Sequence, residues 1–195
     1  IADVETASRV TVDGDPPRPL EARPQTSRVA IGGDYFSTMH VSVKRGRAFS
    51  EVELSNRSPV AVISEDAARR FFAGRDPIGS RVALDAPPGR EDWLQVVGIV
   101  GDLRKSDVDQ GALPQVYVTL SRQPSASIAV VVKSLNGYPL QLVSAIRAQV
   151  AQIDRNQPVH DVATMSRVLY DDLAGSYVLS AILTATGLIA LILCG

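Results

Sequence analysis

The sequence predicts an α+β fold, and three observations support this prediction. Short apolar runs of strand length recur between residues 9 and 134, separated by segments rich in proline, glycine or acidic residues. An amphipathic helical pattern follows one of these runs, at 65–74. A second helical pattern lies between two strand-like runs within 127–163, an order that indicates a β-α-β unit packed on one sheet.

In the first quarter of the chain we expect two strands, at 9–12 and 27–31. The segment 13–25 between them contains four prolines and a glycine, so it cannot be regular secondary structure. A helical turn is expected at 35–39, after two glycines. The basic and aromatic stretch that ends at Phe49 is expected to be a loop.

The next segment contains the clearest strand and helix. Residues 59–64 form a compact apolar run, and Ser64 is suited to cap a helix that begins with Glu65 and Asp66, where negative charge favours the helix dipole. Gly74 is expected to end this helix. Further strands are expected at 81–84, 92–100, 115–120 and 127–134.

After residue 134 the pattern becomes helical. Pro139 suits the first position of a helix. Residues 158–165 are expected to return as a strand, and from Ser166 a helical pattern without proline runs to the end of the sequence. One face of the first helix is expected to carry Leu140, Val143, Ile146, Val150 and Ile153.

The composition, net charge and cysteine count of the chain limit the classes of protein to which it can belong. The chain is 45% hydrophobic and 21% charged, as in globular proteins, and its net charge of −1 gives no reason to expect nucleic-acid binding. The only cysteine is Cys194, so no intrachain disulfide is expected. No signal peptide is recognisable, and because the sequence opens with Ile1 we interpret it as a piece of a longer polypeptide.

The C-terminal run 173–195 contains no charged residue. At about 1.5 Å per residue, a helix of this length would reach the roughly 30 Å thickness of a bilayer core. Asp171 and Asp172 precede the run, and no Lys or Arg follows Arg167, so this end of the helix is expected to face outward. A small-residue face suited to close helix packing would comprise Ser176, Ser180, Thr184 and Gly187. The alternative, in which these hydroxyls bond only their own helix, stays open.

Patterns typical of catalysis or ligand binding are weak. The glycines of 96–102 follow a strand but lack dinucleotide-binding spacing, and 107–111 lacks the ligand positions of a calcium loop. Ser64, His160 and Asp161 could form a triad only without the expected nucleophile elbow. We therefore expect no cofactor, no metal site and no enzymatic activity in this chain.

The segment 69–82 is dense in folding signals. Phe71 and Phe72 end the amphipathic helix, and Asp76-Pro77 makes a turn. Gly79 is expected to allow the backbone turn that leads into the strand at 81–84. We interpret the segment as a folding device without a reactive group.

The ordered set of motifs resembles the extracytoplasmic core domain of MacB-type, FtsX-like ABC transporter permeases. The set comprises "GGDYFSTMHVSVKRGRAFSEVE", "PVAVISEDAARRFFAGRDPIGSRVAL", "WLQVVGIVGDLR", "PQVYVTL", the helix that begins "PLQLVSAIRAQV", and the apolar run. The resemblance covers nearly the whole chain from Ser27 onward. Its motif residues, which it implies to be structural, are Tyr35, Phe36, Gly46, Arg47, Phe49, Phe71, Phe72, Asp76, Pro77, Ile78 and Gly79.

The resemblance implies a division of the chain. Residues 1–165 would form a core domain outside the bacterial cytoplasmic membrane, a mixed α/β porter-like lobe with a small β-rich lobe inserted at about 60–120. Residues 127–163 would be the β-α-β unit of the porter-like lobe. Residues 166–195 would be a stalk helix that becomes a transmembrane segment at 173–195.

The leading hypothesis is a permease domain that couples cytoplasmic ATP hydrolysis to export or to an envelope partner. By the resemblance, its partners would be a cognate ABC ATPase, a second permease subunit in a homodimer, the membrane and an extracytoplasmic adaptor, and ATP would be hydrolysed in a separate domain or subunit. The alternative is a soluble extracytoplasmic binding module with a core C-terminal helix. Dependence of the complete chain on detergent distinguishes the two.

Overall fold

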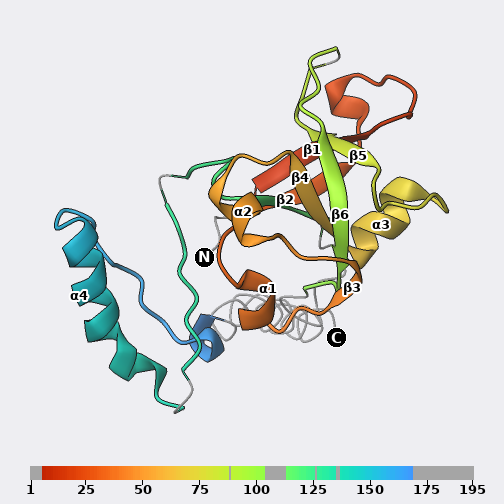
Figure 1. The fold of residues 1–195 in the computed structure, drawn as a ribbon. Coiled ribbons are helices and arrows are strands. Elements are labelled where there is room, and N and C mark those ends of the chain that lie inside the picture. Colours follow the sequence, from red (N-terminus) through yellow and green to blue (C-terminus); the bar gives the residue numbers. More distant parts are fainter. Residues whose placement is uncertain (1–5, 88, 104–112, 126, 135–136, 169–195) are drawn as a thin grey trace, which may run out of the picture. The chain divides into compact units, whose positions relative to one another are not determined.

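The computed structural model describes residues 6–87, 89–103, 113–125, 127–134 and 137–168. The chain divides into two compact units, one of residues 1–104 and 110–132 and the other of residues 105–109 and 133–195. Each unit is described by itself. The first contains the strands of a seven-stranded mixed sheet, shown with its helices in Figure 1.

Six of the seven strands close into a barrel. The order is β6-β4-β7-β2-β1-β5, and β5 pairs again with β6. The neighbours β2 and β7, and likewise β4 and β6, are parallel, whereas the other neighbours are antiparallel. The bounds are β1 Thr6–Val12, β2 Gln25–Ile31, β4 Val60–Ser64, β5 Arg81–Leu84, β6 Leu94–Val100 and β7 Gln115–Thr119.

The neighbours of two strands, β1 and β6, change along their length. The first half of β1 pairs with β2 and its second half, from Val10, pairs with β5. In β6, Leu94 and Gln95 pair with β5, whereas the last three residues pair with the seventh strand, β3 (Val43–Gly46). Among the described strands β3 alone has a single neighbour.

The six barrel strands were predicted from the sequence, within a few residues at each end. Strand β3 lies where we expected a loop, and the short helix α2 (Glu51–Ser55) follows that loop, where we predicted no element. The first strand of the sheet begins at Thr6. The helices of this unit are α1 Tyr35–Thr38, α2 and α3 Glu65–Phe72, with a short 3-10 helix η1 at Leu20–Ala22.

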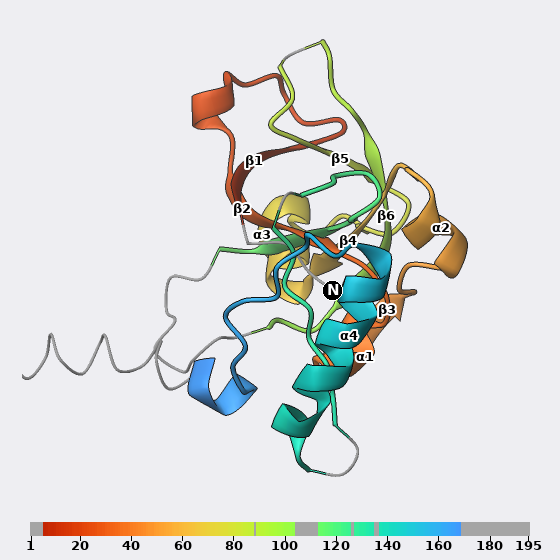
Figure 2. The same ribbon diagram turned by 90° about the vertical axis from the view of Figure 1, so that its left-hand side faces the viewer.

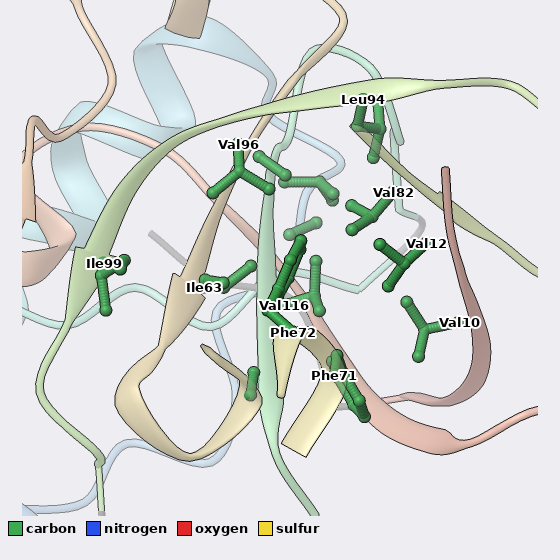
Figure 3. Close-up of a cluster of buried hydrophobic side chains, with 14 residues drawn as sticks. Val10, Val12, Ile63, Phe71, Phe72, Val82, Leu94, Val96, Ile99 and Val116 are labelled. Atoms are coloured by element: carbon green, nitrogen blue, oxygen red, sulfur yellow. The ribbon is translucent and has the colours of Figure 1, made fainter. Parts of the chain in front are cut away.

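The barrel interior is filled by apolar side chains. Figure 3 shows side chains of β1, β4, β5, β6 and β7 pointing toward one another, with Phe71 and Phe72 of α3 beneath them. Because α3 contributes its apolar face here, its charged residues lie on the outside. The buried members include Val10, Val12, Ile63, Val82, Leu94, Val96, Ile99 and Val116.

A second apolar cluster covers the opposite face of the sheet. Alternation along the strands places Val62 of β4 and Tyr117 of β7 on this face, and α1 packs against them through Tyr35 and Phe36. Strands β4 and β7 are buried along their whole length because both of their faces are covered. The central residues of both strands are apolar, as is typical of strands covered on both faces.

The two long connections of the barrel lie side by side, as Figures 1 and 2 show from two directions. One is the proline-rich segment before β2, and the other joins β5 to β6. Arg23 is 4% exposed, and its Nη1 donates to the carbonyl of Ala86 at 2.6 Å. Its Nε donates to the carbonyl of Arg18 at 3.1 Å, so this one side chain joins the two connections.

The second unit contains a 3-10 helix, η2 (Pro139–Leu142), that continues into α4 (Val143–Ile153), in the place where a helix was predicted.

The strands predicted at 127–134 and 158–165 were wrong. Apart from the single bridge residue Ala129, these segments are not paired, and residues 165–168 are helical. An alternating apolar sequence becomes a strand only when another strand pairs with it. The apolar side chains of Ile128, Val130 and Val132 are 46%, 57% and 45% exposed.

Among the described residues, none of the helices has the length and apolar character needed to cross a membrane. The predicted transmembrane segment, 173–195, lies outside the described residues, and so does most of the predicted stalk from Ser166.

Candidate functional site

Aromatic residues from three parts of the chain meet on the outer face of the barrel. The ring of Phe36 lies 5.0 Å from that of Tyr117 in an edge-to-face arrangement, and 6.4 Å from that of Phe49 in a stacked one. Tyr35 approaches both Phe36 and Tyr117. Aromatic pairs at these separations attract each other beyond the burial of their surface. The predicted motif residues Tyr35, Phe36 and Phe49 are therefore brought together, and Tyr117 joins them.

The position of Phe49 depends on a close approach between β3 and β6. Gly46 pairs with Gly98, and φ at Gly46 is 69°, a conformation that favours glycine. A Cβ atom on Gly46 would collide with the carbonyl oxygen of Val97, and one on Gly98 would collide with that of Arg47. The two backbones can therefore approach this closely only with glycine on both strands.

A bulge in β6 lies at the same place. Ala61 of β4 pairs with Val96 and the next residue, Val62, pairs with Gly98, so Val97 is the extra residue. Its carbonyl accepts the N–H of Arg47 at 3.0 Å. A bulge of this kind bends a strand and redirects its side chains. Here it allows β6 to turn from its pairing with β5 toward its pairing with β3.

The motif segment 76–79 also contacts β3 and β6 close to Gly46. Gly79 donates its N–H to the carbonyl of Val96 at 2.8 Å, and the side chain of Ile78 lies against Gly46. The Asp76 carboxylate accepts the N–H of Ile78 at 3.1 Å and a guanidinium bond from Arg45 at 3.0 Å. These bonds hold the pKa of Asp76 below its usual value, with the backbone bond the larger cause.

An ion pair fixes the segment between β3 and α2. Arg47 donates to both carboxylate oxygens of Glu53, at 2.6 and 2.8 Å. The same carboxylate accepts the backbone N–H of Ser50, whose hydroxyl accepts the N–H of Glu53 in return, so that α2 begins with a capping box. The bond from Arg47 is the largest cause, and those from Ser50 add to it, in lowering the pKa of Glu53 to about 2.

The remaining motif residues lie elsewhere. Phe71 and Phe72 belong to the interior cluster, on the opposite face of the sheet from Phe36. Pro77 is buried in the turn that precedes Ile78. The predicted helix-packing residues lie outside the described residues: Ser176, Ser180, Thr184 and Gly187.

The residues of the weak candidate triad, Ser64, His160 and Asp161, all make hydrogen-bond contacts in the structure. The Ser64 hydroxyl is buried and accepts two backbone N–H groups, from Ala67 at 3.2 Å and from Gln115 at 3.1 Å. It therefore caps α3 and ties it to β7. His160 is exposed and its Nδ1 lies 2.7 Å from a carboxylate oxygen of Asp161. Within the described residues, no group of three or more His, Cys, Asp or Glu side chains could hold a metal ion.

Ser50 and Glu53, beside Gly46 in the sequence, were not singled out as site residues. They have the spacing of a capping box, which could have predicted α2. The glycines of 96–102 were noted in the sequence as part of a strand, but a glycine inside a strand identifies a close approach to a particular neighbour only when that neighbour is known. The residues of the cluster around Gly46 form a packed junction, in which Arg47 is paired with Glu53, the rings of Tyr35, Phe36 and Tyr117 are buried, and the ring of Phe49 is partly buried.

Comparison with known proteins adds an independent finding. Residues 1–153 match the sequence model of the MacB-like periplasmic core domain. The macrolide export ATP-binding/permease protein MacB of Aggregatibacter actinomycetemcomitans is 32% identical over 72 residues, which are 37% of this chain and 10% of that protein. MacB 2 of Aeromonas hydrophila is 29% identical over 87 residues, 43% of this chain and 13% of that protein. The chain thus spans about a tenth of the length of these curated relatives.

One solved structure shares the fold. A crystal structure of a domain ascribed to a permease of Porphyromonas gingivalis superposes with a TM-score of 0.50 and 13% identity, covering 86% of this chain and 82% of that one. The periplasmic region of MacB from Actinobacillus actinomycetemcomitans gives 0.49 and 17% identity, over 80% of this chain and 74% of that one.

Proposed function

This chain belongs to the family of MacB-like periplasmic core domains, and from that membership we propose that it transmits motion between an ATP-driven permease and its partners outside the membrane. The chain is the periplasmic domain of a MacB-like ABC permease. Its proposed role is mechanical: hydrolysis of ATP in a separate domain or subunit moves the membrane helices, and this domain carries the movement to an export step or to an envelope partner.

The observation that carries this proposal is the family match over residues 1–153. In the sequence, these residues are followed by the uncharged run 173–195. The closed barrel is suited to the role, because six strands that are each paired on both edges deform less than an open sheet. The paired charges and buried rings around Gly46 fasten β3 and α2 to this barrel. The barrel with β3 and α2 would therefore move as one piece when it is pushed or pulled.

The proposal includes an arrangement in the envelope. Residues 1–165 would lie outside the bacterial cytoplasmic membrane, with a small β-rich lobe inserted at about 60–120 and residues 127–163 in the porter-like lobe. Residues 166–195 would form a stalk that enters the membrane at 173–195, where Ser176, Ser180, Thr184 and Gly187 would face another helix. The proposed partners are a cognate ABC ATPase, a second permease subunit in a homodimer, and an extracytoplasmic adaptor.

The proposal is tested by making the stalk flexible. In the full-length permease, Gly175 and Ser176 are replaced by a longer Gly/Ser stretch, which does not transmit a rotation or a push. We expect ATP hydrolysis to continue and export to be lost. The measurements are phosphate release and export from the same proteoliposomes.

A matched control keeps the stalk helical. Replacing Gly175 and Ser176 by two alanines favours the helix at the same position, so export should be retained. If the flexible variant exports as well as the unchanged protein, the mechanical role is wrong. If residues 1–195 remain soluble and monomeric without detergent, the binding module with a core C-terminal helix is favoured instead.

A further inference from the structure

A hollow of about 620 Å³ opens where β4, β5 and β6 begin. Trp93 and Arg81 contribute the largest side chains to its wall, and Asp13, Pro59 and Gln95 line it beside them. The volume lies within the range of small-molecule sites, which are usually several hundred Å³. None of these five residues belongs to the cluster around Gly46.

The Arg81 guanidinium is held in one orientation. Its Nε and Nη2 both donate to one carboxylate oxygen of Asp13, at 3.0 and 2.6 Å. The backbone reinforces this contact, since the N–H of Asp13 donates to the carbonyl of Arg81 at 2.9 Å. The plane of the guanidinium is therefore fixed rather than free to rotate in solvent.

Trp93 lies against this guanidinium. The central carbon of the Arg81 guanidinium is 5.5 Å from the centre of the Trp93 ring, within the range of a cation–π contact. The Arg81 side chain is nevertheless 53% exposed. A flat cationic group with indole on one side and an exposed surface on the other can accept a second planar ring.

We propose that this hollow binds a planar aromatic ring, which stacks on the exposed side of Arg81 next to Trp93. The charge of Arg81 is already balanced by Asp13, so an anion would gain little, whereas stacking on the face of the guanidinium stays available. Pro59 adds an apolar wall. The ring can belong to a free aromatic compound or to an aromatic side chain of a partner protein. The proposal does not depend on the role in export.

The chain contains a single tryptophan, Trp93, so the tryptophan signal in an NMR spectrum reports on the hollow alone. We would label Trp93 isotopically in the full 195-residue chain, in lipid nanodiscs, and follow its one indole N–H resonance. The probes are N-acetyl-tyrosinamide, N-acetyl-phenylalaninamide, p-cresol and, as the apolar probe without a ring, N-acetyl-leucinamide. Saturable shifts are expected with the three aromatic probes and only a negligible shift with the leucine derivative.

Two variants make the test specific. Arg81→Lys keeps the charge but removes the flat surface, and should weaken binding of the aromatic probes by roughly tenfold. Arg75→Lys is the matched control, because Arg75 also pairs with an aspartate, Asp15 at 2.7 Å, but does not line the hollow. This variant should bind the probes as the unchanged chain does. The unfolding midpoints of both variants verify that each of them is folded.

The relative affinities of the aromatic probes distinguish the two possible sources of the ring. Equal binding of p-cresol and the tyrosine derivative would favour a free aromatic compound, and tighter binding of the amide would favour a protein segment. The proposal is overturned if no aromatic probe shifts the resonance, if the leucine derivative shifts it as strongly, or if Arg81→Lys binds the probes unchanged.

Discussion

Gly46 of β3 and Gly98 of β6 lie opposite each other, and neither has room for a Cβ atom. The obstacles are backbone carbonyl oxygens, those of Val97 and Arg47, which cannot rotate away as a side chain would. This pair sets how closely β3 approaches the barrel, and it thereby positions the ion pair of Arg47 and the ring of Phe49.

Gly98→Ala should therefore loosen β3 from β6. We expect the free energy of unfolding to fall by about 2–3 kcal/mol, the range for overpacking at a rigid site. Urea unfolding measures the loss, and the amide of Arg47, which donates to Val97, should exchange faster with solvent. The matched control is Gly101→Ala, where a new Cβ would have only ordinary contacts, the nearest at 3.5 Å to the side chain of Lys44. Equal losses in both variants would contradict the role of close approach.

Glu53→Gln should lower stability at neutral pH by about 1 kcal/mol, because it weakens both the contact with Arg47 and the capping box. The folded-state pKa of Glu53, about 2, lies below the ordinary value of 4.5. The stabilisation is therefore fully present above pH 4.5 and is lost as the pH falls toward 2. The difference between the two proteins in urea unfolding should shrink across that window. Glu51→Gln, in the same turn without the ion pair, serves as control, and a pH-independent difference for Glu53→Gln would refute the assignment.

Phe36 and Phe49 should be energetically coupled through their stacked rings, 6.4 Å apart. Each single substitution to leucine is expected to destabilise the protein, and a double-mutant cycle should give a coupling of about 0.5–1.5 kcal/mol. The same cycle with Phe36 and Phe71 provides the control, since these residues belong to different clusters. We expect additive effects there, and a coupling of similar size would show that the clusters are not independent.

Ser64→Ala should cost about 2–3 kcal/mol in the free energy of unfolding. It takes the acceptor from two backbone N–H groups in a buried place, those of Ala67 and Gln115. Ser50→Ala, at the exposed cap of α2, should cost about 1 kcal/mol. Thermal and urea unfolding give both values. A loss at Ser64 no larger than that at Ser50 would mean that the bond to β7 contributes nothing beyond the helix cap.

The sequence predicted the barrel strands well because their signal is local. Within the run 59–64, residues 60–63 are all apolar, and the structure buries them on both faces. Strand β3 was missed because its sequence, Val-Lys-Arg-Gly, is short and polar, and it forms only because two glycines admit it beside β6. The strands predicted at 127–134 and 158–165 failed for the converse reason: their pattern is strand-like, but no strand pairs with them among the described residues.

What the sequence alone determined is therefore the identity of most elements, the cap at Ser64, the order of the family motifs and the class of protein, because each is encoded by neighbouring residues. Only the tertiary structure decided that β5 returns to β6 to close a barrel. Only the tertiary structure places the segment 76–79 next to Gly46 and the Arg81 guanidinium against the ring of Trp93. These contacts join residues far apart in the chain, and they arise when the burial of apolar faces selects one set of strand pairings from many that local sequence permits.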